Sequence, residues 1–469
     1  MVSSGRAIAV AASFALCILI ASAMAMAASS PGVEWEKTYD VHGNDQGGSM
    51  QQASDGGYIM AGSSGSLVCL AKINPDGSLQ WKNTYGFGDG AKGYSVAQAS
   101  DGGYVATGSV RQGGKDKVLL MKVDQNGTQL WNKTYGDSDA ESIEGAGTSV
   151  RRASGGYVIA AQYPYPTLNS CGLYLIMTDD NGNMVRNIML GRSGDITSPS
   201  VEQTGDGGFI IAATIHTKGY QGHEPDYDIY LVKFNPSGAT QWEKTIGGSG
   251  SQYCGRDGSV RQAKDGGYVI AGENGSAYLA KTDSSGNLLW GKQYNNSDRA
   301  CSVALADDGG YVLAGTDGAG RPVIIKTSSS GDEEWRETAG VAGEGTTVQK
   351  ESDGGYAMSG TSSGDLCLMK LKAPVKKSSS LFMNGFSGFG DPFGQGSSVD
   401  EGQVGGSLFS SMGLKPLNFG GYSPARSTAN INSPFSFSSM PSPGITGSGY
   451  RFDFPKMAAS FGDGGWPFS

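Results

Sequence analysis

The chain has little charge, few histidines and no long apolar run in its body. Charged residues make up 17% of the 469 positions, there are 3 histidines, and the formal net charge is -9. A chain with a negative net charge has no electrostatic basis for binding phosphate backbones, so nucleic acid is excluded as a partner. Gly 76 and Pro 17 are abundant. These residues destabilise helix interiors, which favours an all-β protein over a helical bundle.

The N-terminal segment has the order of an export signal. Residues 1–27 contain one cation, Arg6, followed by an apolar run over 7–20 and a series of small residues over 21–27. This pattern predicts a signal peptide that is cleaved after Ala27, and therefore a secreted or cell-surface mature chain without a transmembrane segment. An uncleaved N-terminal membrane anchor is the alternative, although the apolar core is short for a membrane span.

The C-terminal segment differs in composition from the rest of the chain. Twelve of the sixteen phenylalanines fall between Phe382 and Phe468, separated by Gly, Ser, Pro and Asn without a strand or helix period. Such a segment has too little contiguous apolar surface to offset its ordering entropy. We therefore expect residues 373–469 to form a low-complexity, disordered Gly/Ser/Phe-rich tail.

A repeated pattern occupies the chain between these ends. Its first mark is Gly-Gly-aromatic, usually after Asp, and it occurs seven times with the aromatic residues 43 to 59 positions apart. The aromatic residues are Tyr58, Tyr104, Tyr157, Phe209, Tyr268, Tyr311 and Tyr356. The second mark is a short apolar run that ends in lysine, followed by a Gly turn and a tryptophan, as in Lys281 to Trp290; Val185 replaces the tryptophan in the weakest copy.

Each unit predicts four antiparallel strands. Asp-Gly-Gly supplies the positive φ of a tight hairpin, and the consecutive apolar residues of 267–272 indicate a strand that is covered on both faces. Seven four-stranded units indicate a seven-bladed β-propeller over residues 33–372. The array opens with a lone fourth strand at 34–39 and ends after a third strand at 366–370. Pairing these two strands, with Trp35 beside Leu368, would close the ring and remove two exposed edges.

The repeat resembles those of known propeller families. The stretch 281–290, with its Asp, Gly turn and Trp, is similar to the repeat of the quinoprotein-like (PQQ-like) propellers. The full unit resembles secreted propeller-repeat proteins that are common in methanogenic archaea. The resemblance implies the fold over residues 33–372. It implies no cofactor, because the chain has no adjacent Cys-Cys pair and no match to the calcium-binding Glu and Asn residues of the active enzymes.

Loop length indicates which face of the ring binds a partner. The first-to-second and third-to-fourth turns are short, whereas the loops on the other face vary and are longest in units three and four, at 162–172 and 216–228. Variable loops on a rigid scaffold commonly carry binding residues. The resulting candidate patch contains Tyr163, Tyr165, His216, Tyr220, His223, Asp226 and Tyr227. The alternative is that these loops merely tolerate insertions.

No metal site or catalytic residue emerges from the sequence. His216 and His223 with Asp226 could form a surface metal site, but their spacing matches no known motif. The string Asp-x-Asn-Gly at 124–127 and the string Asp-Asn-Gly at 180–182 lack the remaining ligands of a calcium loop and indicate hairpin turns. There is no Gly-x-Ser-x-Gly nucleophile elbow.

Cysteines and sequons add two expectations. Five cysteines remain after cleavage, so at least one stays unpaired; Cys69 and Cys367 are expected as core residues, with Cys171 and Cys254 as the candidates for pairing. Candidate glycosylation sites are Asn126, Asn132, Asn274 and Asn295.

The sequence therefore predicts a secreted or cell-surface, non-enzymatic propeller that binds an extracellular protein or glycan through its variable loops. The alternatives are an extracellular enzyme of quinoprotein-like or glycan-cleaving type, and a structural envelope component that assembles through the tail.

Overall fold

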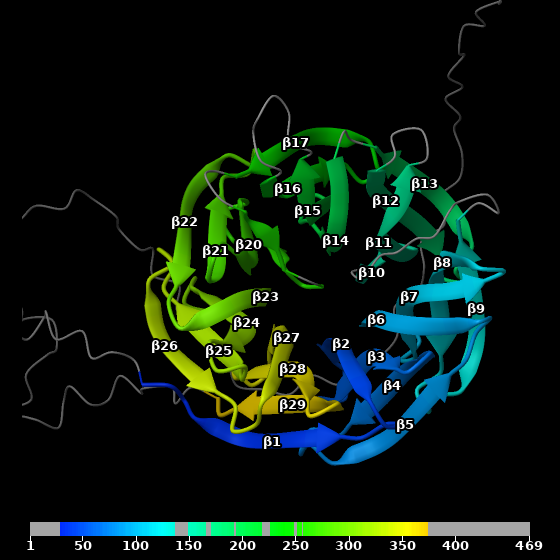
Figure 1. Cartoon of the computed structure of the whole chain (residues 1–469), viewed down its shortest axis with the longest axis horizontal. Helices are drawn as coiled ribbons and strands as arrows, with labels where there is room; N and C mark the ends of the chain where they lie inside the picture. Colours follow the sequence, from blue (N-terminus) through cyan, green and yellow to red (C-terminus); the bar gives the residue numbers. More distant parts are fainter. Residues whose placement is uncertain are drawn as a thin grey trace, which may run out of the picture. The chain divides into compact units, whose positions relative to one another are not determined.

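The computed structural model describes residues 29–136, 149–165, 170–191, 194–217, 226–247, 251–255 and 257–373. Within these ranges the regular secondary structure consists of β-strands, and no helix is long and apolar enough to cross a membrane. The strands form seven antiparallel sheets arranged as blades around a central axis (Figure 1). The predicted seven-bladed propeller of four-stranded blades is confirmed.

In each blade the strands follow one another in the chain from the centre of the ring outward, except that β1 forms the outer strand of blade 7. Blade 1 consists of β2 (Asp45–Gln52), β3 (Tyr58–Ser64), β4 (Leu67–Ile73) and β5 (Leu79–Tyr85). Blade 2 consists of β6 (Gly90–Gln98), β7 (Tyr104–Gln112), β8 (Lys115–Val123) and β9 (Gln129–Tyr135). Blade 3 consists of β10 (Ser149–Ala153), β11 (Gly156–Tyr165), β12 (Ser170–Asp179) and β13 (Met184–Leu190). Blades 4 and 5 are β14 (Gly194–Gln203), β15 (Phe209–Thr217), β16 (Asp226–Phe234), β17 (Thr240–Ile246); β18 (Tyr253–Cys254), β19 (Val260–Gln262), β20 (Tyr268–Glu273), β21 (Ala277–Thr282), β22 (Leu288–Tyr294). Blades 6 and 7 are β23 (Ser297–Leu305), β24 (Tyr311–Asp317), β25 (Pro322–Thr327), β26 (Glu333–Thr338); β27 (Gly343–Lys350), β28 (Tyr356–Ser362), β29 (Asp365–Leu371), β1 (Val33–Tyr39).

Blade 5 differs from the others at its inner edge. Its innermost strand is interrupted, so that the short strands β18 and β19 both pair with β20.

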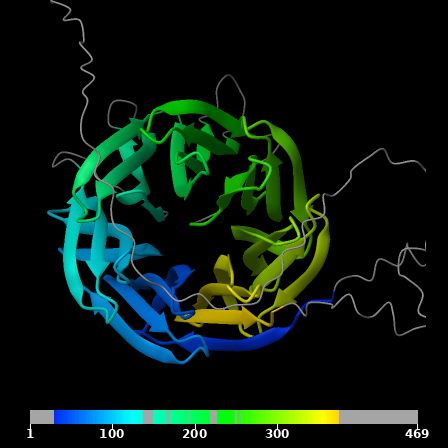
Figure 2. The same ribbon diagram turned by 180° about the vertical axis from the view of Figure 1, so that it is seen from behind.

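The ring is closed by the N-terminal strand, as predicted. β1 pairs antiparallel with β29 as the outer strand of blade 7, and the two strands lie side by side in both views (Figures 1 and 2). The predicted register is wrong by two residues, because Trp35 lies opposite Lys370 and Lys37 lies opposite Leu368. Trp35 opposite Lys370 is the pairing of motif tryptophan and motif lysine that the other blades also have, as in Trp81 opposite Lys72 and Trp290 opposite Lys281.

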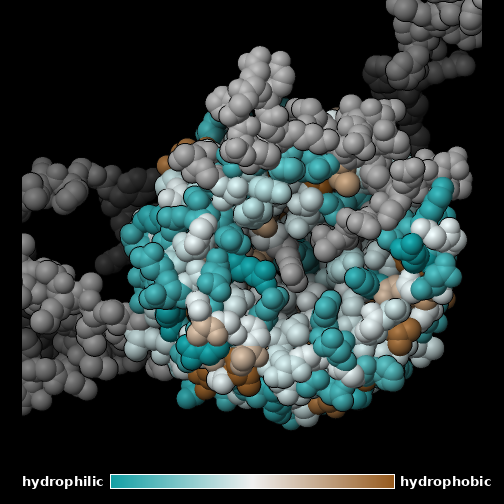
Figure 3. All heavy atoms as spheres, in the orientation of Figure 1, coloured by the Kyte–Doolittle hydropathy of each residue, from teal (hydrophilic) through white to brown (hydrophobic). Residues whose placement is uncertain are grey.

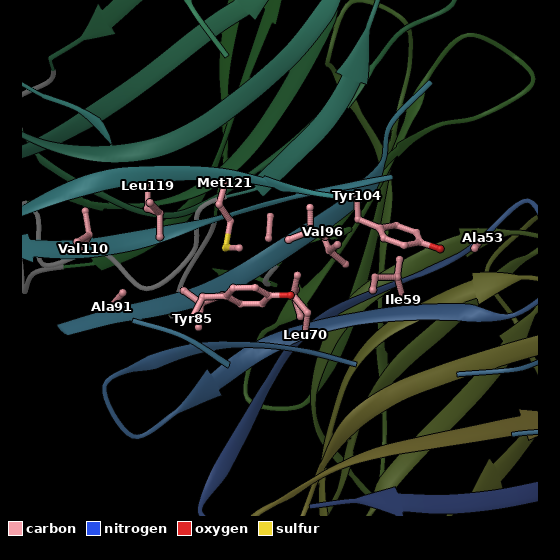
Figure 4. Close-up of a cluster of buried hydrophobic side chains, with 14 residues drawn as sticks. Ala53, Ile59, Leu70, Tyr85, Ala91, Val96, Tyr104, Val110, Leu119 and Met121 are labelled. Atoms are coloured by element: carbon pink, nitrogen blue, oxygen red, sulfur yellow. The ribbon is translucent and has the colours of Figure 1, made fainter. Parts of the chain in front are cut away.

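The hydrophobic core lies between neighbouring blades. The second and third strands are buried along nearly their whole length, which explains their consecutive apolar residues. Between blades 1 and 2, for example, Ile59 and Leu70 of one sheet pack against Val96 and Met121 of the next (Figure 4). Every blade thus needs a neighbour to cover its faces, and an open array would expose one such layer at each end.

In four blades the tryptophan and the tyrosine of the fourth strand connect that blade to the next one. Gly127 of blade 2 has a φ of +80°, and a Cβ there would lie 3.0 Å from the ring of Trp81 in blade 1. The Tyr85 hydroxyl donates a hydrogen bond of 2.6 Å to the Gly127 carbonyl. The same hydrogen bond joins Tyr39 to Gly77, Tyr135 to Gly182, and Tyr294 to Gly331. The turn glycine is required because it combines positive φ with a close aromatic ring.

The repeated aspartate and lysine form an ion pair within each blade that contains them. In blade 5, Lys281 is 3% exposed, and its Nζ lies 2.8 Å from Asp265 Oδ2 and donates to the Thr282 carbonyl at 2.8 Å. Burial opposes ionisation of Asp265, but hydrogen bonding and charge from Lys281 outweigh it and lower the pKa of that carboxyl. Equivalent pairs occur at Lys72–Asp55, Lys122–Asp101, Lys233–Asp206, Lys326–Asp308 and Lys370–Asp353.

Blade 3 lacks both members of this pair. Met177 occupies the lysine position, because it pairs with Val158 just as Lys72 pairs with Ile59 in blade 1. Ser154 occupies the aspartate position directly before the Gly-Gly pair. The strand register also corrects the sequence interpretation of this blade. Arg186, and not Val185, lies opposite Met177 where the other blades carry tryptophan. The aspartate and the lysine are therefore exchanged together, as expected for partners in one interaction.

Exchanging the two residues of blade 5 for those of blade 3 tests this dependence. Asp265→Ser should destabilise the ring by about 2 kcal/mol, because it leaves a buried ammonium group without its carboxylate. Lys281→Met should cost less, since the carboxylate it leaves behind is 59% exposed and can be hydrated. The double variant should therefore be more stable than Asp265→Ser alone. Urea unfolding measures all three, and additive losses would contradict the pairing.

Candidate functional site

The strand order fixes which segments share a face of the ring. In an up-and-down blade, the second-to-third loop and the crossing to the next blade emerge at one end of the strands, and the two short turns emerge at the other. We call the first end the loop face. It carries the β15–β16 hairpin end, the start of β18 and the start of β14. The view in Figure 3 shows a largely hydrophilic surface on which hydrophobic residues form small, separate patches.

Three aromatic side chains form a row on the loop face between blades 4 and 5. His216 at the end of β15 lies opposite Tyr227 of β16, and their rings stack with centroids 4.4 Å apart at 16°. Tyr227 in turn packs on Tyr253 of β18, with centroids 4.8 Å apart at 32°. All three residues are half-buried. We call His216, Tyr227 and Tyr253 the aromatic row.

Asp195 lies on the same side of the β15–β16 hairpin as His216 and Tyr227, whereas Asp226 and Asp228 lie on the other side. Asp195 at the start of β14 lies 3.8 Å from His216 Nδ1 and accepts a hydrogen bond from the Cys171 backbone at 2.8 Å. Asp226 accepts hydrogen bonds from the Tyr227 backbone and from Ser251. Burial, followed by the charge of Asp226, raises the pKa of Asp228. The site therefore combines aromatic surface with hydrogen-bond acceptors.

The structure brings only some of the predicted patch residues together. His216 and Tyr227 come together as described, whereas Tyr163 is 7% exposed and packs on Tyr174, with ring centroids 5.2 Å apart. Tyr165 lies in β11 opposite Ser170. Tyr220 and His223 lie outside the described residues.

Asp226 projects from the other side of the β15–β16 hairpin than His216. It is opposite Thr217, one position along from the His216–Tyr227 pair, and successive side chains of a strand alternate between faces. The described residues therefore do not assemble His216 and Asp226 as metal ligands. The strings at 124–127 and 180–182 are turns between β8 and β9 and between β12 and β13, as expected.

The sequence interpretation missed Tyr253. The candidate patch was taken from loops within blades 3 and 4, and the crossing from blade 4 to blade 5, which leads to Tyr253, was left out.

A ladder of hydroxyl groups joins the innermost strands around the channel. Ser95 Oγ accepts a hydrogen bond from the Val150 backbone at 3.1 Å, and Ser149 Oγ accepts one from the Val201 backbone at 3.2 Å. Ser49, Ser200 and Ser302 accept equivalent bonds from Val96, Gly258 and Val348. These bonds attach five of the seven blades to their successors at the centre of the ring.

Asp257 of blade 5 reaches across the channel to blades 2 and 3. It lies in the interruption between β18 and β19 and is 6% exposed. Its carboxylate accepts hydrogen bonds from Ser95 at 2.8 Å and from Ser149, and it pairs with Arg151 at 2.9 Å. Asp257 stands two residues before the inner-strand serine, where the other repeats have Gly47, Gly93, Gly147, Ser198, Ala300 and Gly345. An alignment of the seven repeats would have revealed this charged residue among small ones.

Further charges continue from Asp257 along the inner strands. Glu202 of blade 4 accepts a hydrogen bond from Arg261 of blade 5 at 2.9 Å and lies 3.6 Å from Arg151. Burial opposes ionisation of Asp257, but the charge of Arg151 and its hydrogen bonds outweigh it and lower the pKa of that carboxyl. This network connects blades 2 to 5 inside the channel, and we assign it a structural role.

The predicted cysteine and glycosylation sites occupy different environments. Cys69, Cys254 and Cys367 are buried free cysteines, and burial raises the pKa of the Cys254 thiol to about 12. Asn126, Asn132 and Asn295 are exposed, and Asn274 is half-buried at the β20–β21 turn. Their glycosylation stays a prediction.

Comparison with known proteins supports the fold. Residues 228–373 match the family model described as the outer membrane protein assembly factor BamB. The match spans the ring from β16 to β29 and is similar to the PQQ-like repeat that the sequence suggested. No curated protein matches the chain.

Solved structures that are similar have low sequence identity to this chain. A protein of unknown function from Bacteroides caccae is 16% identical, with 55% of this chain and 82% of that chain covered and a TM-score of 0.37. The β-propeller domain of Cps50 (Swd1) from Myceliophteria thermophila is 11% identical, with 72% and 100% covered and a TM-score of 0.46. A puromycin hydrolase variant complexed with PGG is 13% identical, with 69% and 52% covered and a TM-score of 0.45.

Proposed function

We propose that the protein is a secreted or cell-surface, non-enzymatic scaffold that binds a partner through the aromatic row on its loop face. The observation that carries this proposal is the stacking of His216, Tyr227 and Tyr253 across two blades. Half-buried aromatic rings supply large contact area at a low entropic cost, and such residues dominate the binding energy of many interfaces. The neighbouring carboxylate of Asp195 offers acceptors to hydroxyl, amide or basic groups of the partner.

The partner that fits this surface best is an extracellular protein. The match of residues 228–373 to the BamB family model favours a protein partner, because that model is described as an assembly factor. The matched residues include Tyr253. The acidic residue Asp195, next to His216, favours a partner with basic or hydrogen-bond-donating side chains. A glycan is the second candidate, since its hydroxyl groups suit the same carboxylate and its apolar faces suit aromatic rings.

Export rests on the sequence of residues 1–27, with its single arginine, apolar run and small-residue segment. Secretion would place the loop face in contact with extracellular or envelope partners. Cell fractionation with an antibody against the ring tests this part of the proposal, and retention of the mature chain in the cytoplasm would contradict it.

Truncation of the aromatic row tests the binding surface. Tyr227→Ala and Tyr253→Ala should each weaken binding at least 10-fold, because truncated aromatic hot spots commonly cost about 2 kcal/mol or more. Binding is measured by surface plasmon resonance against a panel of purified envelope proteins from the same organism, and against a glycan array.

Leu289→Ala is the matched control, because Leu289 is an exposed apolar side chain on the outer strand β22, at 58% exposure. It should leave binding unchanged. Thermal unfolding of each variant checks that the ring is intact. Partners whose affinity is the same for wild type and for the Tyr227→Ala/Tyr253→Ala double variant would rule out this surface.

A further inference from the structure

Three aspartates meet where the ends of the propeller chain close the ring. Asp40 directly follows β1, Asp45 begins β2, and Asp365 begins β29. One carboxylate oxygen from each of them lies within 4.8 Å of one from each of the other two. Two of these residues come from the N-terminal part of the ring and the third comes from its last hairpin, so only ring closure brings them together.

Asp45 is buried without a full set of partners. Its side chain is 0% exposed, and Oδ2 accepts a hydrogen bond of 2.6 Å from the Val41 backbone. Oδ1 is buried and has no hydrogen-bond partner in the described part of the chain. A buried carboxylate oxygen without a partner is costly. The other two carboxylates of the cluster add like charge next to it, which increases this cost.

No basic side chain compensates the cluster within the described ranges. Neither Asp40, Asp45 nor Asp365 takes part in an ion pair there, whereas the aspartate of the Asp-Gly-Gly turn in six blades is paired with a lysine. Lys82 Nζ donates a hydrogen bond to the backbone carbonyl of Asp40 and not to its carboxylate. The cluster therefore has the charge of a cation site.

The donor atoms suit a hard divalent cation. Carboxylate oxygens are the preferred ligands of calcium, which holds them at about 2.3–2.6 Å, so two ligands of one ion lie at most about 5 Å apart. The 4.8 Å limit on the cluster meets this condition. Asp45 also lines an open cavity of about 400 Å³ with Asn44 and Gly364, which provides access from solvent.

We propose that Asp40, Asp45 and Asp365 bind a single calcium ion that fastens the ring closure. The ion connects the end of β1 to the start of β2 and to the start of β29. It compensates the buried charge of Asp45 and opposes separation of the N-terminal strand from blade 7. This role is independent of the aromatic row and of any partner bound there.

Calorimetry and thermal unfolding of the purified full-length chain test the site. After treatment with EDTA and its removal, titration with CaCl₂ should show one binding site. The melting temperature should rise by at least about 4 °C once calcium exceeds its dissociation constant 100-fold. MgCl₂ at the same concentration should give a clearly smaller rise, because magnesium demands shorter, near-octahedral coordination.

Two variants and one control make the result specific. Asp45→Asn and the half-buried Asp365→Asn should each lose the calcium-dependent rise, and in EDTA both should be at least as stable as wild type because the repulsion is relieved. Asp298→Asn, at an exposed aspartate near the start of β23, should keep the full rise. The proposal fails if wild type shows no calcium-dependent heat and no rise, if Asp365→Asn retains the rise, or if magnesium is as effective as calcium.

Discussion

A chain that starts at residue 41, and so lacks β1, is expected to unfold at a much lower urea concentration and less cooperatively than a chain that starts at residue 29. A peptide of residues 29–44 added in trans is expected to reverse both effects. β1 is one of the four strands of blade 7, but it is separated from its partner β29 by the whole ring. Its removal leaves the sheet edge of β29 exposed and uncovers the layer between blades 7 and 1.

The side chains of β1 explain why the loss should be large. Tyr39 is 7% exposed, packs in the core cluster with Leu366 and Leu368, and donates a hydrogen bond to the Gly77 carbonyl of blade 1. Trp35 packs edge-on against Tyr58, with ring centroids 6.0 Å apart. Removing each large aromatic side chain costs about 3–5 kcal/mol, and the two together approach the whole stability of a typical domain.

Circular dichroism during urea unfolding measures the effect. The truncated chain should unfold at a lower urea concentration and with a less cooperative transition, and addition of the peptide should return the midpoint toward that of the longer chain. A control peptide that carries Trp35→Ala and Tyr39→Ala should not rescue it. Equal midpoints for the two chains without peptide would show that β1 does not hold the ring closed.

The seven blades could be predicted from the sequence because each local signal has a geometric cause. The turn glycines are irreplaceable where a positive φ coincides with the ring of the preceding tryptophan, as at Gly127. The unpaired first and last strands of the array indicated closure by β1. The strand register was not predicted correctly from the motifs. Trp35 lies opposite Lys370, and Arg186 takes the tryptophan position of blade 3. Small shifts in strand pairing depend on the packing of both strands.

The candidate site was predicted only in part. Loop length located the correct hairpin in blade 4, where His216 and Tyr227 stack. It did not show that Tyr163 turns inward onto Tyr174, because burial at the end of a strand depends on which neighbour fills the space. Nor did any local pattern mark Asp257, whose partners are 106 or more residues away in the sequence.

Replacing Asp257 by alanine is expected to destabilise the ring by about 3 kcal/mol, because a guanidinium group with only 20% of its side chain exposed loses its carboxylate. Arg151 would retain one acidic neighbour, Glu202 at 3.6 Å, and the hydroxyl groups of Ser95 and Ser149 would lose their acceptor. Removing both charges in Asp257→Ala/Arg151→Ala should cost less than the sum of the single changes, which a double-mutant cycle from urea unfolding measures.

The same carboxylate should make stability depend on acid pH. The pKa of Asp257 is lowered in the folded ring, so between that value and the unfolded value of about 3.9 the unfolded chain binds more protons. The contribution of Asp257 is therefore fully present above about pH 4 and is lost as the pH falls through the folded value. Asp257→Asn should reduce the slope of stability against pH in this range.

Asp307→Ala provides the matched comparison. Asp307 also forms an ion pair, with Lys350, but it is 76% exposed, and exposed pairs contribute about 0–1 kcal/mol. The two aspartates should therefore differ several-fold in the cost of their removal, because Asp257 is buried with three partners whereas Asp307 lies in solvent. If Asp257→Ala costs no more than Asp307→Ala, water must reach Arg151, and the channel between blades 2 and 5 is not held by this carboxylate.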